Sequence, residues 1–266
     1  MSGRAAAFFD LDRTLISGSS GLYWARAATR TGLISRRQLA ALGVDHLKFR
    51  LHGSTDEATE RVLDQVKLLL NGVPTRRIAR MAPEVLVGVL PKIYPEMLDE
   101  VYAHQDAGRP TFIVSAAGDE LVQLLARILY MDGGIGTAYE VAADGTFTGE
   151  IGGTFIYGEG KVEAMQRFAD EHGIELESSY AYSDSASDLP MLRAVGNPVV
   201  VNPDEELARI AREQGWRVMR FENLGRRIAA AGISLTLLSA VLLARRRIGP
   251  WTEPTSRSQA SRVKPS

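Results

Sequence analysis

The chain reads Phe8-Phe9-Asp10-Leu11-Asp12-Arg13-Thr14-Leu15-Ile16 near its N-terminus, where an apolar run that begins at Ala5 ends in two carboxylates. A run of this length fits a buried strand of a parallel sheet, and ligands bind at the carboxyl ends of such strands. Asp10 and Asp12 would repel each other there unless a cation lies between them. A hard divalent cation such as Mg²⁺ relieves that repulsion and can bind phosphate oxygens as well. The alternative is that both residues cap a helix, because Asp and Thr are frequent at helix starts.

Three later motifs, in this order along the chain, favour a site over a helix cap. A strand-like run ends at Ser115-Ala116-Ala117-Gly118, a hydroxyl followed by small residues at the start of a helical pattern, as an anion site at a helix N-terminus requires. Gly158-Glu159-Gly160-Lys161 opens another helical stretch with a single lysine. A second strand-like run ends at Tyr182 and is followed by Asp184 and Asp188. The four motifs together predict a phosphate site.

These residue types suit phosphoryl transfer. The reaction needs in-line positioning and neutralisation of spread negative charge, which a metal ion, a lysine and helix amides provide. A carboxylate nucleophile divides hydrolysis into two easier displacements, and a second carboxyl acts first as acid and then as base. Thr14 carries the next hydroxyl that can orient Asp12. We interpret Arg13 as a surface or loop-closing residue.

The ordered motifs resemble the haloacid dehalogenase (HAD) superfamily of phosphohydrolases, within its phosphoserine-phosphatase-like subfamily IB. The resemblance covers roughly residues 5–220. It implies an α/β fold in which a Rossmann-like parallel sheet carries helices on both faces, with a helical cap inserted after the first strand. It also implies an enzyme that hydrolyses phosphomonoesters with the help of Mg²⁺.

The resemblance assigns the chemistry to three aspartates. Asp10 is implied to be the nucleophile that becomes an aspartyl phosphate. Asp12 is implied to protonate the leaving oxygen and then to activate water. Asp184 is implied to complete the metal site with Asp10 and the backbone carbonyl of Asp12.

The resemblance also implies residues that bind the phosphate and residues that support the site. Ser115, Ala116 and Lys161 would bind the phosphoryl group, and Lys161 would hold the nucleophile as well. Asp188 would orient the lysine or a metal-bound water, with Thr14 as a further supporting residue.

Periodicity predicts how the chain is divided. Helical patterns without convincing strands occupy 20–32, 35–51, 55–71 and 75–90, which indicates an inserted cap. Asp144-Gly145 between alternating runs predicts a hairpin over 138–151, and alternating strand and helix patterns reach residue 221. We therefore expect a core formed by 1–18 and 91–222, a cap at 19–90, an apolar helix at 223–247 and a disordered basic tail at 248–266.

Composition is typical of a cytoplasmic enzyme. A chain of 266 residues that is 45% hydrophobic can build one core and a smaller unit. The absence of cysteine excludes disulfides and thiolate zinc sites, and the four histidines lack ligand spacing. The N-terminus shows no signal-peptide pattern, and no nucleic-acid partner is expected.

The C-terminal segment permits two interpretations. Residues 228–244 lack charge and lie between arginines, and residues 245–266 carry six Lys or Arg and one Glu. The apolar stretch is short for a membrane span, and a single pass would export the basic flank. Residues 226–247 could instead lie as an interfacial helix on the inner face of an anionic membrane. The alternative is burial against the core or a partner chain.

The favoured function is a Mg²⁺-dependent phosphatase that acts on a small phosphorylated metabolite or a lipid-like phosphate ester. One alternative is a phosphoserine phosphatase proper, although residues 16–24 offer no carboxylate for the substrate amine and Ser187 stands where those enzymes commonly have asparagine. Another is a regulatory protein of the same fold that binds a phosphorylated ligand without turnover. A dehalogenase is disfavoured, because those enzymes lack a carboxylate at the position of Asp12.

Overall fold

The structure, a computed structural model, describes residues 4–39 and 56–221. The chain divides into two compact units, Met1–Arg220 and Phe221–Ser266. The predicted cap helix over 35–51 is described only as far as residue 39, and the predictions for 223–266 lie outside the described residues. Among the helices that are described, none is both long and apolar enough to cross a membrane.

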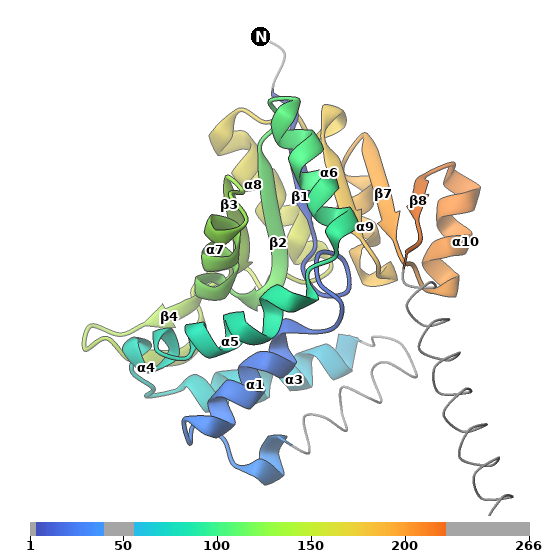
Figure 1. The fold of residues 1–266 in the computed structure, drawn as a ribbon. Coiled ribbons are helices and arrows are strands. Elements are labelled where there is room, and N and C mark those ends of the chain that lie inside the picture. The colour runs from blue at the N-terminus through green and yellow to red at the C-terminus, as the bar shows by residue number, and fades with distance from the viewer. Residues whose placement is uncertain (1–3, 40–55, 222–266) are drawn as a thin grey trace, which may run out of the picture. The chain divides into compact units, whose positions relative to one another are not determined.

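A parallel sheet of six strands forms the centre of the first unit (Figure 1), in the order β3-β2-β1-β6-β7-β8. The strands are β1 (Ala7–Phe9), β2 (Thr111–Gly118), β3 (Gly133–Thr137), β6 (Tyr180–Ser183), β7 (Asn197–Val201) and β8 (Arg217–Met219). The order reverses its direction at β1 and β6, which lie side by side. A ligand site of a parallel α/β sheet is expected at the carboxyl ends of such a pair.

Helices cover both faces of the sheet, which confirms the predicted fold class. Right-handed crossovers place α6 (Pro95–Asp106) and α7 (Asp119–Ile128) on one face. The other face is covered by α8 (Glu159–His172), α9 (Leu189–Arg193) and α10 (Glu205–Gln214). Figure 1 shows α6 in front of the sheet and α8 behind it. Phe8 packs in the core under α8, whereas Phe9 stacks on Tyr182 on the opposite face.

The cap follows β1, as predicted, and consists of α1 (Ser20–Arg30), α3 (Asp56–Leu70), α4 (Thr75–Ala79) and α5 (Ala82–Val89), with a short 3₁₀ helix at Leu90–Lys92. These helices lie beyond the end of the sheet toward which the arrowhead of β2 points in Figure 1. The prediction of one helix over 75–90 was wrong, because the helix breaks before Pro83. Proline lacks an amide donor and is tolerated only in the first turn of a helix, so a new helix begins there.

The predicted hairpin is present and braces the cap. Its strands β4 (Tyr139–Val141) and β5 (Phe147–Ile151) form a separate antiparallel pair. The amide of Gly72 donates to the carbonyl of Phe147 at 2.8 Å, and the amide of Phe147 donates to the carbonyl of Val73 at 2.9 Å. Lys67 of α3 also pairs with Glu150 at 2.7 Å.

The sequence patterns missed β3 and misplaced the end of β2. The sequence of β3 has a weak strand pattern because it contains three glycines, at 133, 134 and 136. Glycine is required at 134, because α7 packs so closely that a Cβ there would collide with Val122. The helix expected from Ser115 begins only at Asp119, and β2 continues to Gly118 with a shift of register after Val114.

Candidate active site

Two buried aspartates meet at the carboxyl edge of the central strands. Asp10 directly follows β1 and Asp184 directly follows β6, and these strands pair with Phe9 opposite Tyr182. The exposed fractions of Asp10 and Asp184 are 7% and 4%. Burial of two carboxylates in this position requires cations close to them.

Lys161 supplies the central positive charge. Its Nζ donates to Asp10 Oδ1 at 2.6 Å and to Asp188 Oδ2 at 2.7 Å, and the lysine is 3% exposed. Asp188 also accepts from Ser183 Oγ at 2.7 Å. Lys161 can enter the site because Gly160 lets the first turn of α8 lie against the carbonyl of Phe155, where a Cβ would collide. The structure thus brings Asp10, Lys161 and Asp188 together.

Burial shifts the pKa values of ionisable residues in this site. It raises the pKa of Asp10 from its ordinary value of 3.8 to about 7, because the lost hydration outweighs the attraction of Lys161. Burial alone would lower the pKa of Lys161, but the Asp10 and Asp188 carboxylates outweigh it and raise that pKa. Burial also raises the pKa of Asp184 well above its ordinary value. Perturbed ionisable groups of this kind cluster at functional sites.

Asp12 turns toward the start of the cap. Its Oδ1 accepts from the amide of Ser20 at 2.8 Å and its Oδ2 from Ser19 Oγ at 3.1 Å. Asp12 therefore accepts the first amide of α1, but neither aspartate is the residue at which a helix starts, because Ser19 precedes α1. Burial raises the pKa of Asp12, against the opposing effect of the hydrogen bonds from Ser20 and Ser19. Ser19 precedes α1 without capping it, since its hydroxyl is donated to Asp12.

The expectation that Thr14 orients Asp12 was wrong. Thr14 is fully buried, and its Oγ1 has no hydrogen-bond partner within the described part of the chain. The hydroxyl that contacts Asp12 belongs to Ser19. A serine just before a helix was a visible signal, but the loop that returns it to Asp12 was not.

Arg13 is more than a surface residue. Its Nε lies 3.1 Å from Asp184 Oδ2, and its side chain is 47% exposed whereas that of Asp184 is 5% exposed. Its backbone has φ 64°, a left-handed conformation that is unusual outside glycine. A single arginine in a loop gives no spacing signal, which is why sequence reasoning missed the contact.

The two predicted phosphate-binding residues of β2 lie at the same edge as Asp10. Ser115 is 3% exposed, and its Oγ accepts from the amide of Ala117 at 3.2 Å. The carbonyl of Ala116 accepts from Thr137 Oγ1 at 3.0 Å. These bonds hold the irregular end of β2 in place just before α7 begins.

The residues present fit a magnesium ion. Within residues 4–39 and 56–221, no cluster of three or more His, Cys, Asp or Glu side chains is arranged to hold a metal. The implied site needs only the carboxylates of Asp10 and Asp184 and the backbone carbonyl of Asp12. Asp184 Oδ2 is buried and makes no hydrogen bond, so a cation would satisfy it. An oxygen-only donor set suits Mg²⁺.

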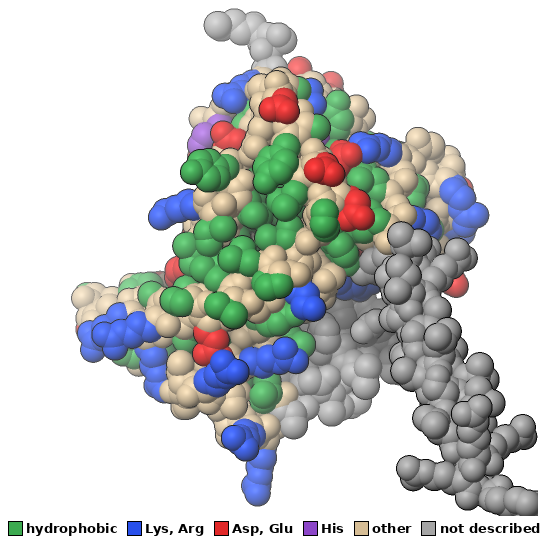
Figure 2. All heavy atoms as spheres, in the orientation of Figure 1, with side chains coloured by type: hydrophobic (Ala, Val, Ile, Leu, Met, Phe, Trp, Pro, Cys, Tyr) green, Lys and Arg blue, Asp and Glu red, His purple; other side chains and the backbone are tan. Residues whose placement is uncertain are grey.

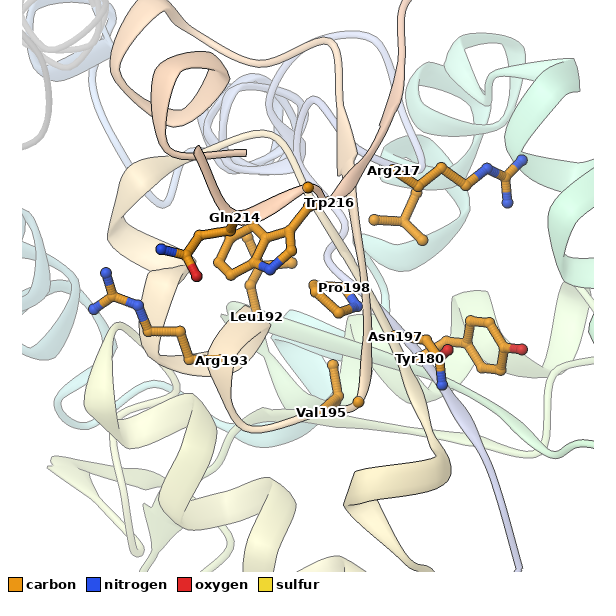
Figure 3. Close-up of a pocket in the computed structure, with 12 residues that line it drawn as sticks. Tyr180, Leu192, Arg193, Val195, Asn197, Pro198, Gln214, Trp216 and Arg217 are labelled. Carbon is orange, nitrogen blue, oxygen red and sulfur yellow. The ribbon is translucent and has the colours of Figure 1, made fainter. Parts of the chain in front are cut away.

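A separate hollow of about 580 Å³ lies at the opposite edge of the sheet (Figure 3). Tyr180, Asn197 and Arg217, the first residues of β6, β7 and β8, line it together with Trp216 and Arg193. It contains none of the predicted site residues, because the carboxylates lie at the carboxyl ends of the strands. We therefore place the candidate active site at the cap side of the sheet.

Residues 7–193 match the family described as haloacid dehalogenase-like hydrolase. The chain belongs to this family of enzymes. The match begins in β1 and ends with α9, so it includes every residue of the candidate site. The resemblance inferred from the motifs is confirmed.

Three curated relatives carry different names. The chain is 37% identical to the inhibition of morphological differentiation protein of Streptomyces azureus, over 82% of this chain and 79% of the relative. It is 33% identical to phosphoserine phosphatase SerB1 of Mycobacterium tuberculosis, over 88% and 76%. It is 32% identical to histidinol-phosphatase of Neisseria meningitidis, over 81% and 98%.

A solved structure of a protein of unknown function from Bordetella pertussis is also similar. It aligns with a TM-score of 0.71 and 30% identity, and the alignment covers 82% of this chain and 98% of the other. The likeness extends over nearly all of the other protein.

Proposed function

We infer that the protein is a Mg²⁺-dependent phosphomonoester hydrolase in which Asp10 forms an aspartyl phosphate. The observation that carries this proposal is the buried group in which Lys161 holds Asp10 at 2.6 Å and Asp188 at 2.7 Å beside Asp184. The phosphatase names of two relatives support the same reaction class. A binding protein without turnover would have no need of Asp12 as a second carboxyl.

The reaction proceeds in two displacements. An oxygen of Asp10 attacks phosphorus, the ester P–O bond breaks, and the leaving oxygen takes a proton from the Asp12 carboxyl. Asp12 then takes a proton from water, whose oxygen attacks phosphorus and breaks the bond to Asp10. Lys161 and the amides at the end of β2 neutralise the phosphoryl oxygens. A magnesium ion held by Asp10, Asp184 and the carbonyl of Asp12 would supply further charge neutralisation.

The substrate class is a small phosphorylated metabolite. The names of the relatives include phosphatases of phosphoserine and of histidinol phosphate. Figure 2 shows Lys and Arg side chains gathered over the cap. Arg26 of α1 and Arg76 of α4 are exposed residues of the cap. A basic surface of this kind attracts anionic esters by long-range electrostatics. The lipid-like ester and the interfacial helix at 226–247 stay predictions.

A panel of phosphate esters, with and without amino groups, tests the proposal. We expect Mg²⁺-dependent release of phosphate that is abolished by Asp10→Asn and lowered about 10²-fold or more by Asp12→Asn. Asp106→Asn, which changes an exposed aspartate of α6, is the matched control and should keep full activity. Hydrolysis by Asp10→Asn at the wild-type rate would overturn the mechanism.

The same panel separates this enzyme from a phosphoserine phosphatase proper. The loop from Ile16 to Ser19 and the first turn of α1 offer no carboxylate for an amine. We therefore expect kcat/KM for phosphoserine to exceed that for amine-free esters by less than about 10³. A larger ratio would assign the chain to the phosphoserine phosphatases.

A further inference from the structure

Arg13 contacts the candidate metal site from the solvent side. The loop that carries it closes by a hydrogen bond of 3.0 Å from the Arg13 amide to the carbonyl of Gly18. Its backbone is left-handed, with φ 64°, a conformation that is unfavourable for a residue with a side chain. This loop geometry lets Arg13 Nε lie 3.1 Å from Asp184 Oδ2 while nearly half of the side chain stays in water.

Asp184 is held differently from the other acids of the site. Asp10 and Asp188 share Lys161, which is buried and hydrogen-bonded to both. Asp12 has two hydrogen bonds from the start of α1. Within residues 4–39 and 56–221, the ion pair of Asp184 is with Arg13, and its Oδ2 makes no hydrogen bond. Asp184, one of the two carboxylates that a metal ion would need, is therefore the one whose partner is half exposed and makes no hydrogen bond to its Oδ2.

The geometry points to an exchange in which Arg13 holds Asp184 when no metal ion is bound and gives up this carboxylate when Mg²⁺ binds. This inference rests on the proposed function, because it takes Asp184 as a magnesium ligand. The Arg13 guanidinium lies 3.1 Å from Asp184 Oδ2, and a metal ion would be attracted to the same carboxylate, so the two cations would compete for it. A like charge that stays a few ångström from the ion also weakens its binding. Arg13 would thus lower the affinity for Mg²⁺ and act as a positioning residue for Asp184.

Calorimetric titration of Mg²⁺ into the full-length protein, without substrate, tests the exchange. We expect Arg13→Gln to bind Mg²⁺ roughly thirty-fold more tightly than wild type, the factor given by a unit charge about 4 Å from a divalent ion in water. Arg13→Lys keeps the charge and should stay close to wild type. Arg193→Gln is the matched control, because this exposed arginine lies by the hollow at the opposite edge of the sheet (Figure 3) and should leave the affinity unchanged.

Thermal melts in EDTA add an independent readout. In EDTA, Arg13→Gln should have a lower melting temperature than wild type, because Asp184 loses its partner. Addition of Mg²⁺ should raise the melting temperature of this variant by more than it raises that of wild type. Equal or weaker Mg²⁺ binding by Arg13→Gln would overturn the exchange, and so would equal tightening by Arg193→Gln. Asp184→Asn separates the two proposals. Suppose that wild type binds Mg²⁺, that Asp184→Asn does not, and that Arg13→Gln binds it with the wild-type affinity. In that case only the exchange fails. If wild type itself does not bind Mg²⁺, the proposed function fails as well.

Discussion

Lys161 donates hydrogen bonds to two carboxylates, and one of them is the proposed nucleophile. Its bonds to Asp10 and Asp188 fix the ammonium group between the end of β1 and the 3₁₀ turn at Ala186–Asp188, which follows β6. Even so, burial raises the pKa of Asp10 to about 7, so one cation does not fully offset the lost hydration. A second cation next to Asp10 would complete the charge balance, which is consistent with a magnesium enzyme.

This balance predicts how stability depends on pH. Because the pKa of Asp10 rises on folding from 3.8 to about 7, the native protein binds a proton more tightly, and stability falls as pH rises through that window. Mg²⁺ favours the carboxylate form. We therefore expect Mg²⁺ to raise the melting temperature more at about pH 7.5 than at about pH 5, relative to EDTA. Melts at both values check this.

The titration of His104 does not alter the predicted difference between the Mg²⁺ effects at the two pH values. Burial lowers its pKa from 6.5 to about 4, so its contribution is lost as pH falls through that range, with and without Mg²⁺ alike. Its Nε2 lies 2.8 Å from the Tyr182 hydroxyl, which donates to the Glu100 carboxylate rather than to an acid of the candidate site. Asp10→Asn should remove most of the difference between the two pH values. A Mg²⁺ effect that is larger at pH 5 would contradict the assignment.

At the scale of elements, the first helix of the cap is connected directly to the proposed general acid. Ser19 and Ser20, at the start of α1, hold both carboxylate oxygens of Asp12. The hairpin β4–β5 holds the other end of the cap through Gly72 and Val73. The position of the cap and the orientation of Asp12 are therefore linked.

Ser19→Ala tests this link. The hydroxyl of Ser19 lowers the pKa of Asp12, so its loss should raise that pKa. We expect the acid limb of the kcat profile to move to higher pH and kcat to fall about ten-fold or more, because one hydrogen bond to a charged group is worth about 1.5–3 kcal/mol. Ser17→Ala, two residues away, is the control and should leave the profile in place. An unchanged profile for Ser19→Ala would show that this bond does not tune Asp12.

Two glycines that are both tightly packed should differ in their effect on catalysis, because one of them lies in the first turn of α8. A Cβ at Gly160 would collide with the carbonyl of Phe155, and one at Gly196 would collide with the carbonyl of Glu177. Each alanine substitution should cost about 1–3 kcal/mol of stability through overpacking. Gly160→Ala should also lower kcat at least ten-fold, because it displaces Lys161, whereas Gly196→Ala should leave kcat nearly unchanged. Denaturant melts and kinetics below the melting range measure both effects, and equal kcat values would contradict the role of this turn.

At the scale of the whole molecule, the sequence allowed most of the site to be predicted, because its residues directly follow strands or open a helix. Asp10 and Asp184 follow apolar runs, and strands of a parallel sheet share one carboxyl edge. Lys161 could be placed there from its position at the start of a helix. Contacts and strands that depend on the conformation of a loop or on tertiary packing, rather than on sequence periodicity, could not be predicted.

Three features illustrate that limit. The contact of Arg13 with Asp184 depends on one left-handed residue and on the loop closed by Gly18. The bond from Ser19 to Asp12 depends on the same loop. The strand β3 is glycine-rich because α7 lies against it, so its sequence carries a weak strand signal. In each case tertiary packing, and not local propensity, decides the conformation.

The proposed mechanism depends most on the formation of a covalent acyl phosphate on Asp10, and trapping of this intermediate tests it most directly. Wild-type protein is quenched during turnover with Mg²⁺ and a hydrolysed ester, reduced with borohydride and analysed by peptide mass spectrometry. We predict reduction of the acyl phosphate at Asp10 alone, dependent on Mg²⁺ and substrate and lost in Asp10→Asn. A modification at a different residue, or none in protein that is turning over substrate, would contradict the account.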